Sequence, residues 1–197
     1  FDLASSVQTV FNEIATNLTK KVFEKFNSKN LCLAGGVAQN ILMNQKIYLD
    51  SGFKNIFVQP ASHDAGTSLG AALLALEKNG QLIKEKKFTA LQGQKFSNDE
   101  IKKLLDSYGI SYYKPKNIYN YAAKLISKGN VVGWFHGRTE FGPRALGSRS
   151  ILADPRKSSM KEIVNKKIKF RESFRPFAPS ILREFTKEWF EIDKEVP

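Results

Sequence analysis

The sequence predicts an α/β first half followed by an α+β second half. In residues 3–80, segments with helical apolar spacing alternate with two short apolar runs, which is the order of a mainly parallel sheet flanked by helices. The stretch 81–94 has no clear period and contains four consecutive charged residues. Beyond it the expected helices and strands no longer alternate regularly. We therefore predict two domains, residues 1–85 and 86–197.

Each element is predicted from its local pattern. Apolar residues recur at helical spacing from Val7 to Phe26, so a long amphipathic helix is expected. In the second half, Ser97 and Glu100 have the spacing of a capping box, and Gly109 should end the helix that they begin. Helices are expected over 3–29, 37–46, 69–79, 98–108, 119–128 and 160–167, and strands over 31–34, 56–58, 131–135, 150–152 and 179–182.

Charge is distributed unevenly along the chain. The net charge is +12, and residues 84–197 hold 24 lysines and arginines against 13 acids. All seven arginines lie between Arg138 and Arg183. Arginine has a planar fork of donors that holds phosphates or carboxylates in a fixed orientation, so the cluster favours an anion site, with a solvated basic surface as the alternative.

Composition also excludes some classes of protein. No apolar run approaches the roughly 20 residues of a membrane span. A single cysteine, Cys32, excludes an internal disulfide framework, and its apolar neighbours predict a buried, inert thiol. A reducing, cytoplasmic setting fits this composition. The chain begins with Phe1 and carries no signal segment, so we interpret it as a fragment.

Two loops after the predicted strands could bind ligands. Gly35 and Gly36 follow the first strand, where glycines allow close approach and a helix N-terminus could bind phosphate, although an ordinary tight turn is the simpler interpretation. Asp64 follows the second strand and could coordinate a metal, or equally cap the next helix. Its neighbour His63 is ambiguous between ligand and loop residue.

The densest constellation is the stretch 137–156, which we call the arginine string. It holds four arginines, three glycines and Ser150, the residue types that a site for multiply charged phosphates requires. A basic segment with three phenylalanines follows at 169–179. If this segment is a strand, Lys169, Arg171 and Ser173 share one face and the phenylalanines belong to the core.

These strings resemble a known family. GGVAQN, FVQPASHDAG with GAALLAL, GWFHGRTEFGPRALGSRSILADPR and KFRESFRPFAPSIL are similar to the O-carbamoyltransferases of nodulation-factor and antibiotic biosynthesis. The matching segments are residues 31–76 and 131–182. The arginine string is long and specific to that family.

The resemblance implies a fold and a reaction. Residues 1–85 would be the C-terminal part of an actin/Hsp70/sugar-kinase-like (ASKHA) domain, and residues 86–197 part of a YrdC-like domain. The YrdC-like domain would make carbamoyl-adenylate from carbamoyl phosphate and ATP with Mg²⁺. The ASKHA domain would then pass the carbamoyl group to a hydroxyl of a small molecule or saccharide, using a metal that we expect to be Fe²⁺.

The resemblance also implies roles for residues. Asp64 would be the metal ligand present here. The family's histidine-rich metal motif is absent, since only His63 and His136 occur, and the second domain is short, so this chain alone should be inactive. The nucleotide would contact Gly35, Gly36, Asn40, Lys169 and Arg171, and the adenylate-forming pocket would be lined by Arg138, Arg144, Arg149 and Ser150.

A different class of function also fits the charge. The basic second half could be a nucleic-acid-binding module related to the proteins of tRNA threonylcarbamoylation. The fixed Arg–Gly spacing argues against it, because a groove that binds a phosphate backbone needs no such spacing. We therefore expect neither a nucleic-acid nor a membrane partner.

Overall fold

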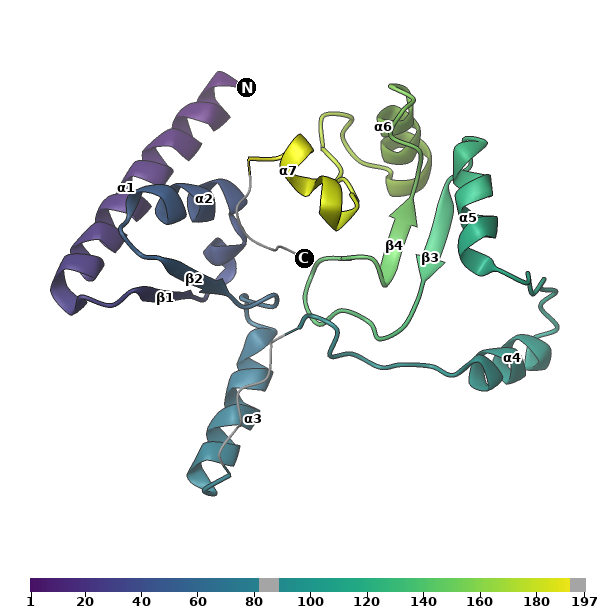
Figure 1. The fold of residues 1–197 in the computed structure, drawn as a ribbon, viewed down its shortest axis with the longest axis horizontal. Coiled ribbons are helices and arrows are strands. Elements are labelled where there is room, and N and C mark those ends of the chain that lie inside the picture. Colours follow the sequence, from purple (N-terminus) through teal and green to yellow (C-terminus); the bar gives the residue numbers. More distant parts are fainter. Residues whose placement is uncertain (82–88, 192–197) are drawn as a thin grey trace. The chain divides into compact units, whose positions relative to one another are not determined.

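A computed structural model describes residues 1–81 and 89–191 (Figure 1). The chain forms two compact units, the first comprising residues 1–91 and 141–144 and the second residues 92–140 and 145–197. The predicted domain boundary near residue 85 lies outside the described residues. Among the described residues, no helix is both long enough and apolar enough to cross a bilayer.

The first unit contains the predicted parallel sheet. Strand β1 (Asn30–Leu33) pairs in parallel with β2 (Asn55–Val58), so that Leu33 lies opposite Val58. Parallel pairing places the carboxyl ends of both strands at one edge, where ligands bind in open α/β sheets. Helices α1 (Asp2–Phe26), α2 (Ile41–Asp50) and α3 (Gly66–Lys78) complete this unit (Figure 1).

The core of the first unit lies where α1 and α2 pack together. Ile47 of α2 is 1% exposed, and the rings of Phe23 and Phe53 meet edge to face with centroids 5.2 Å apart. Helix α1 ends at Phe26 because Asn27 adopts the left-handed conformation, which asparagine tolerates better than most residues. The helix is therefore shorter than the predicted 3–29 and does not reach Asn30.

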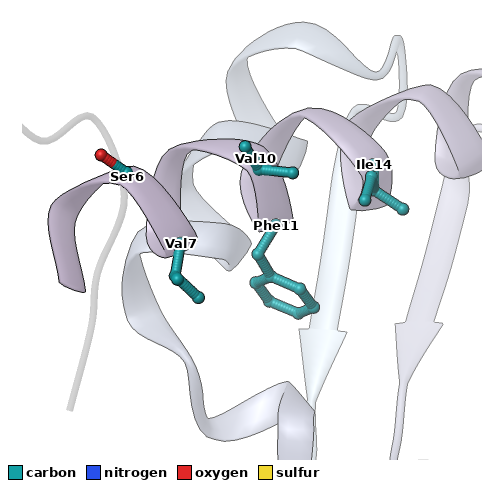
Figure 2. Close-up of a pocket in the computed structure, with 5 residues that line it drawn as sticks. All are labelled: Ser6, Val7, Val10, Phe11 and Ile14. Carbon is teal, nitrogen blue, oxygen red and sulfur yellow. The ribbon is translucent and has the colours of Figure 1, made fainter. Parts of the chain in front are cut away.

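Most of the apolar stripe that predicted α1 is exposed in the structure, and Phe11 and Val22 are half-buried. Figure 2 shows Val7, Val10, Phe11 and Ile14 along one side of the helix, where they line a surface pocket with Ser6. The buried positions of α1 are instead Thr16 and Thr19, whose hydroxyls occupy a different face. The spacing therefore predicted the helix correctly, but not which of its faces is covered within the described residues.

Three other expectations for the first unit need correction. The predicted helix 37–46 is divided into a 3₁₀ turn, Gly36–Gln39, and α2, because Asn40 accepts a hydrogen bond from the Met43 amide and starts a new helix. Helix α3 begins at Gly66, earlier than expected. Cys32 is exposed, since β1 alternates and places this thiol on its less covered side.

The second unit contains an antiparallel strand pair and short helices. Strand β3 (Val132–Phe135) pairs with β4 (Arg149–Leu152), placing Phe135 opposite Arg149. The predicted capping box forms at the start of α4, where Ser97 and Glu100 exchange hydrogen bonds. The helices of this unit are α4 (Asn98–Ser107), α5 (Ile118–Ser127), α6 (Met160–Ile163) and α7 (Thr186–Trp189).

The region after β4 differs from the sequence-based expectation. Helix α6 continues as a π-helical turn, Val164–Lys169, and Phe170 then takes a left-handed conformation. Lys169 therefore ends a helical turn, and it does not share a strand face with Arg171. The strand expected over 179–182 is also absent. Phe170, Phe174 and Phe177 are all exposed, so none of the three phenylalanines is a core residue as predicted.

Candidate nucleotide and anion sites

In the first unit, the two loops that follow the strands are tied together. The Gly35 amide donates a hydrogen bond to the Ser62 carbonyl at 2.7 Å, which joins the glycine turn to the loop that carries Asp64. Gly35 has a φ of 96°, a conformation that favours glycine. A Cβ added at Gly36 would meet no atom within 4 Å. The structure thus joins the Gly35–Gly36 turn to the loop that carries Asp64, and the role of these residues in binding a ligand stays a prediction.

Asp64 is not the cap of α3. The N-cap position belongs to Ala65, and no side chain caps this helix. Asp64 contributes only its carbonyl oxygen, which accepts from the Thr67 hydroxyl at 2.6 Å. Its carboxylate is exposed and remains available for a ligand or a cation. Among residues 1–81 and 89–191, no three His, Cys, Asp or Glu side chains gather as a metal site. If Asp64 binds a metal, these residues therefore do not supply a complete set of ligands around it.

Buried polar atoms near Asp64 have no partner in the described part of the chain. His63 accepts from the Ala65 amide through Nδ1 at 3.3 Å, which leaves Nε2 to carry the proton, and this buried donor is unpaired. The Ser62 hydroxyl is likewise buried and unpaired, with only 7% of the residue exposed. Sequence reasoning did not single out Ser62, because an isolated serine in a loop carries no distinctive pattern.

Asn40 has a local structural role. Its side-chain oxygen caps α2, and its amide nitrogen donates to Gln8 Oε1 at 2.9 Å. Gln8 also donates back to Asn40 Oδ1 at 3.3 Å. The side-chain amide of Asn40 is therefore already engaged on both its oxygen and its nitrogen. Its contact with a nucleotide stays a prediction.

In the second unit, the arginine string is organised by a buried carboxylate. The Oε1 atom of Glu140 accepts hydrogen bonds from the Leu146 and Ser148 amides, each at 2.7 Å. Its Oε2 atom accepts from Arg149 Nε at 3.0 Å, and Arg149 Nη2 donates to the Glu140 carbonyl at 2.9 Å. The Glu140 side chain is fully buried. We call this arrangement the Glu140 clamp.

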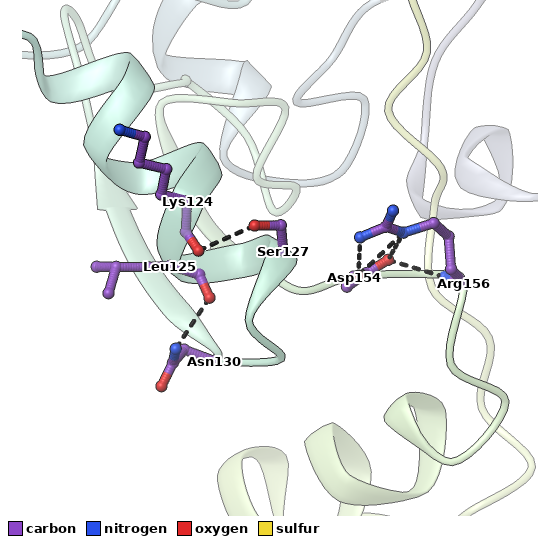
Figure 3. A network of polar contacts seen from close by, with 6 residues as sticks. All are labelled: Lys124, Leu125, Ser127, Asn130, Asp154 and Arg156. Atoms are coloured by element: carbon purple, nitrogen blue, oxygen red, sulfur yellow. Dashed lines mark hydrogen bonds and ion pairs between the residues drawn. The ribbon is translucent and has the colours of Figure 1, made fainter.

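The clamp keeps Glu140 ionised. Burial alone would raise the pKa of Glu140, but the hydrogen bonds from Ser148 and Leu146 and the Arg149 guanidinium outweigh it and hold the pKa at about 2. A second carboxylate of the string behaves similarly. The Arg156 guanidinium and amide hold the pKa of Asp154 at about 2, and Figure 3 shows this pair beside the end of α5.

The other residues of the predicted pocket are placed differently. Arg138 donates to the Gly93 carbonyl at 3.0 Å, and the Ser150 hydroxyl accepts from the Gly147 amide at 3.0 Å. Arg138, Arg149 and Ser150 all belong to the second unit, whereas Arg144 groups with the first. The role of Glu140 was not predicted, because a single acid in a basic segment carries no distinctive pattern, although a buried carboxylate needs cationic or N–H partners.

Comparison with known proteins decides the family. Residues 1–73 match the family described as Carbamoyltransferase N-terminus, and residues 123–197 match Carbamoyltransferase C-terminus. The chain belongs to the carbamoyltransferase family. This finding confirms the resemblance that the sequence strings indicated.

Individual relatives align with nearly all of residues 1–197. It is 43% identical to an uncharacterized protein of Synechocystis, with 100% of this chain and 33% of the relative covered. It is 42% identical to Nodulation protein NolNO of Sinorhizobium fredii, over 97% of this chain and 29% of the relative. It is 40% identical to Nodulation protein NolO of Bradyrhizobium diazoefficiens, over 97% of this chain and 36% of the relative. The chain thus spans about a third of the length of these curated relatives.

Within the carbamoyltransferase C-terminal match, a buried asparagine orders the basic segment. Asn165 has no exposed surface, and its Oδ1 accepts from Arg171 Nε at 2.7 Å. Its Nδ2 donates to the carbonyls of Arg175 and Ser173 at 3.0 and 3.3 Å. The Arg171 guanidinium also lies 4.6 Å from the centre of the Phe177 ring. Arg171 is therefore held in place before any ligand binds, while Lys169 is exposed.

We expect Asn165→Ala to lower the free energy of unfolding of the second unit by about 2 kcal/mol. The change leaves one guanidinium N–H and two carbonyls without their partner, and unmade buried hydrogen bonds carry costs of that size. Urea denaturation followed by tryptophan fluorescence measures it, since Trp134 and Trp189 both lie in this unit.

The matched control for this change is Asn130→Ala. Asn130 also donates to a carbonyl, that of Leu125 at 2.9 Å, but it is exposed at the end of α5 (Figure 3). A water molecule can replace it, so we expect a loss below about 0.5 kcal/mol. Equal effects of the two changes would contradict the role given to Asn165.

Proposed function

We propose that this chain is part of an ATP-dependent O-carbamoyltransferase. The observation that carries the proposal is Arg149 of the arginine string, which the Glu140 clamp orients, in a chain that matches the N-terminal and C-terminal models of the carbamoyltransferase family. Fixed guanidiniums stabilise charge that develops on phosphates, because they need no reorganisation during the reaction. A generic basic surface would not require a buried carboxylate to shape it.

The second unit would form carbamoyl-adenylate. Water first hydrolyses carbamoyl phosphate to carbamate and inorganic phosphate. An oxygen of the carbamate then attacks the α-phosphorus of ATP and displaces pyrophosphate. Negative charge gathers on the α-phosphate and the leaving pyrophosphate, which Arg138, Arg149 and Mg²⁺ would neutralise. Lys169 and Arg171 would add charge at the nucleotide. In this proposal the unit has a YrdC-like fold.

The first unit would transfer the carbamoyl group. A hydroxyl oxygen of a small molecule or saccharide attacks the carbamoyl carbon, AMP leaves, and the hydroxyl proton passes to the phosphate or to water. Gly35 and Gly36 would allow the nucleotide to approach the backbone. In this proposal the unit belongs to an ASKHA domain and acts in the cytoplasm.

Asp64 would be one ligand of a divalent metal, with Fe²⁺ as our expectation. Its exposed carboxylate, which caps no helix, fits a ligand role. The remaining ligands would come from outside the described residues, because no three His, Cys, Asp or Glu side chains in the described part of the chain gather as a metal site. When bound, such a metal would supply a Lewis acid for the transfer step.

A nucleic-acid-binding module is the second candidate function. The observation that favours it is Phe170, which is 83% exposed between Lys169 and Arg171, because exposed aromatic rings among basic residues can stack on bases. Binding of this kind should weaken steeply with salt, with log K falling by about 0.7 to 0.9 per phosphate contact for each unit of log salt concentration.

Pyrophosphate release separates these functions. The intact carbamoyltransferase that carries residues 1–197 should release pyrophosphate only when both ATP and carbamoyl phosphate are present, and without any acceptor. Release that ignores carbamoyl phosphate would contradict the proposed function. Salt-sensitive binding to RNA without any such release would favour the second candidate.

A further inference from the structure

We infer that Asn165 is a positioning residue, which holds the Arg171 guanidinium ready to bind a phosphate of the nucleotide. Arg171 would touch the ligand, and Asn165 would act only through Arg171. That the ligand is a nucleotide rests on the proposed function, whereas the contacts between these two residues do not.

The first step in the argument is that Asn165 binds Arg171 at two points. The Asn165 carbonyl accepts a hydrogen bond from the Arg171 amide at 3.1 Å, and its side-chain Oδ1 accepts from Arg171 Nε at 2.7 Å. The chain can return to Asn165 in this way because Phe170 adopts the left-handed conformation, with a φ of 48°. That conformation is unfavourable for phenylalanine and persists only where the surrounding contacts hold it. Asn165 therefore fixes both the backbone and the guanidinium of Arg171.

The second step is that the holder is itself immobile. Asn165 has no exposed surface, and its Nδ2 donates to the carbonyls of Ser173 and Arg175 at 3.3 and 3.0 Å. The Arg171 guanidinium also lies 4.6 Å from the centre of the Phe177 ring, a distance at which a cation and a ring attract each other. An arginine that is ordered before its ligand arrives loses less conformational entropy when the ligand binds.

The third step is that this holder leaves the positive charge of Arg171 uncompensated. Arg149, Arg156 and Arg175 each bind a carboxylate. Arg171 is held instead by an amide oxygen and an aromatic ring, which carry no net charge, and it forms no ion pair with the residues that the structure describes. A guanidinium that is oriented without being neutralised keeps its full attraction for an anion.

The fourth step is the space beside Arg171. A surface pocket of about 420 Å³ is lined by Lys166, Phe170, Arg171 and Glu172. Small-molecule sites commonly have volumes of about 300–1,000 Å³. Lys166 and Glu172 are each already engaged in an ion pair with another residue. Arg171 is therefore the lining residue whose charge is available to a ligand, and its Nη1 donates to none of the described residues.

Binding of ATP by the intact carbamoyltransferase tests the role of Asn165. Asn165→Ala should weaken calorimetrically measured ATP binding about tenfold, because the guanidinium loses the acceptor that orients it. In the Arg171→Met background the same change should have less than about a twofold effect, because Asn165 acts only through Arg171. A role confined to stability would show no such dependence on Arg171. Equal weakening in both backgrounds, or unchanged ATP binding in Asn165→Ala, would overturn the inference.

Phe177→Leu is a second variant, which the fold should tolerate. Phe177 is 40% exposed, and leucine keeps an apolar side chain while it removes the ring that faces the guanidinium. ATP binding should weaken about threefold, the loss expected for one cation–ring contact. Unchanged ATP binding in this variant would show that the ring takes no part in positioning Arg171, and would count against the inference.

The matched control is Asn130→Ala. It removes an exposed side-chain amide that donates to a carbonyl in the same unit, and it has no contact with Arg171. ATP binding should change by less than about twofold, as expected for a surface change away from the site. A loss as large as that of Asn165→Ala would show that the effect is not specific to Arg171, and would also overturn the inference.

Kinetic measurements separate this inference from the proposed function. Asn165→Ala should raise the KM for ATP in pyrophosphate release about tenfold, and should change the KM for supplied carbamoyl-adenylate in the transfer step less than about twofold. A raised KM for carbamoyl phosphate alone would show that Arg171 binds a different anion, and would refute the nucleotide assignment. If the wild-type enzyme releases no pyrophosphate, the proposed function fails, and ATP binding by Asn165→Ala still decides whether Asn165 positions Arg171.

Discussion

Glu140→Gln should lower the free energy of unfolding of the second unit by about 2 kcal/mol and slow carbamoyl-adenylate formation about 100-fold. Glutamine keeps one oxygen for the Leu146 and Ser148 amides, but its NH₂ group would face the Nε–H of Arg149, donor against donor. A buried donor without an acceptor costs about 1–3 kcal/mol. The kinetic loss follows because Arg149 loses the partner that orients it.

The pH dependence of stability offers an independent measurement of the clamp. The pKa of Glu140 is about 2 in the folded protein against an ordinary value of 4.5. A carboxyl whose folded pKa is lowered contributes stability above its unfolded pKa, and this contribution is lost as the pH falls toward the folded pKa. The free energy of unfolding, measured by tryptophan fluorescence, should therefore fall as the pH is lowered from about 4.5 to 2. In Glu140→Gln the contribution of Glu140 to this fall should be absent, so the dependence on pH should be less steep.

The control for this prediction is Glu162→Gln. Glu162 also forms an ion pair, with Lys166, but both side chains are more than half exposed. Exposed pairs contribute little because water and salt screen them. Its effects on stability and on adenylate formation should be small. If the two glutamine variants behave alike, the clamp does not organise the arginine string.

Asp64→Ala should abolish carbamoyl transfer, by at least 100-fold, while carbamoyl-adenylate formation continues. The structure removes the alternative that Asp64 stabilises α3 as its cap, because no side chain caps this helix. The melting temperature of the variant, followed by circular dichroism, should therefore stay close to that of the wild type. Transfer is measured with supplied carbamoyl-adenylate, and metal content by elemental analysis of the purified intact enzyme.

Glu77→Ala is the matched control for Asp64→Ala. It removes an exposed carboxylate from α3, the helix that follows Asp64, and it touches neither ligand loop. We expect full transfer and an unchanged metal content. An Asp64→Ala enzyme that keeps both would show that Asp64 is not a ligand. A large loss of stability would instead point to a structural role that the geometry does not show.

Local pattern was sufficient for most of the elements. The capping residues Ser97 and Glu100 form their reciprocal bonds as predicted, since such a box depends on only four consecutive residues. The parallel pairing of β1 with β2 also follows from the order of apolar runs. Local pattern failed after the helical turn that ends at Lys169. There Asn165 binds main-chain groups up to ten positions away, and residues 170–175 form neither helix nor strand.

The sequence by itself determined the family, the order of the elements and the presence of a glycine turn, an acid loop and an arginine string. Only the tertiary structure decided how their charges are used. It paired Arg149 with the buried Glu140 and left Arg144 on a segment that packs against Pro60. These outcomes depend on the path of a loop bent at Gly142 and Gly147, both with positive φ, and the spacing of charges along the chain does not encode that path.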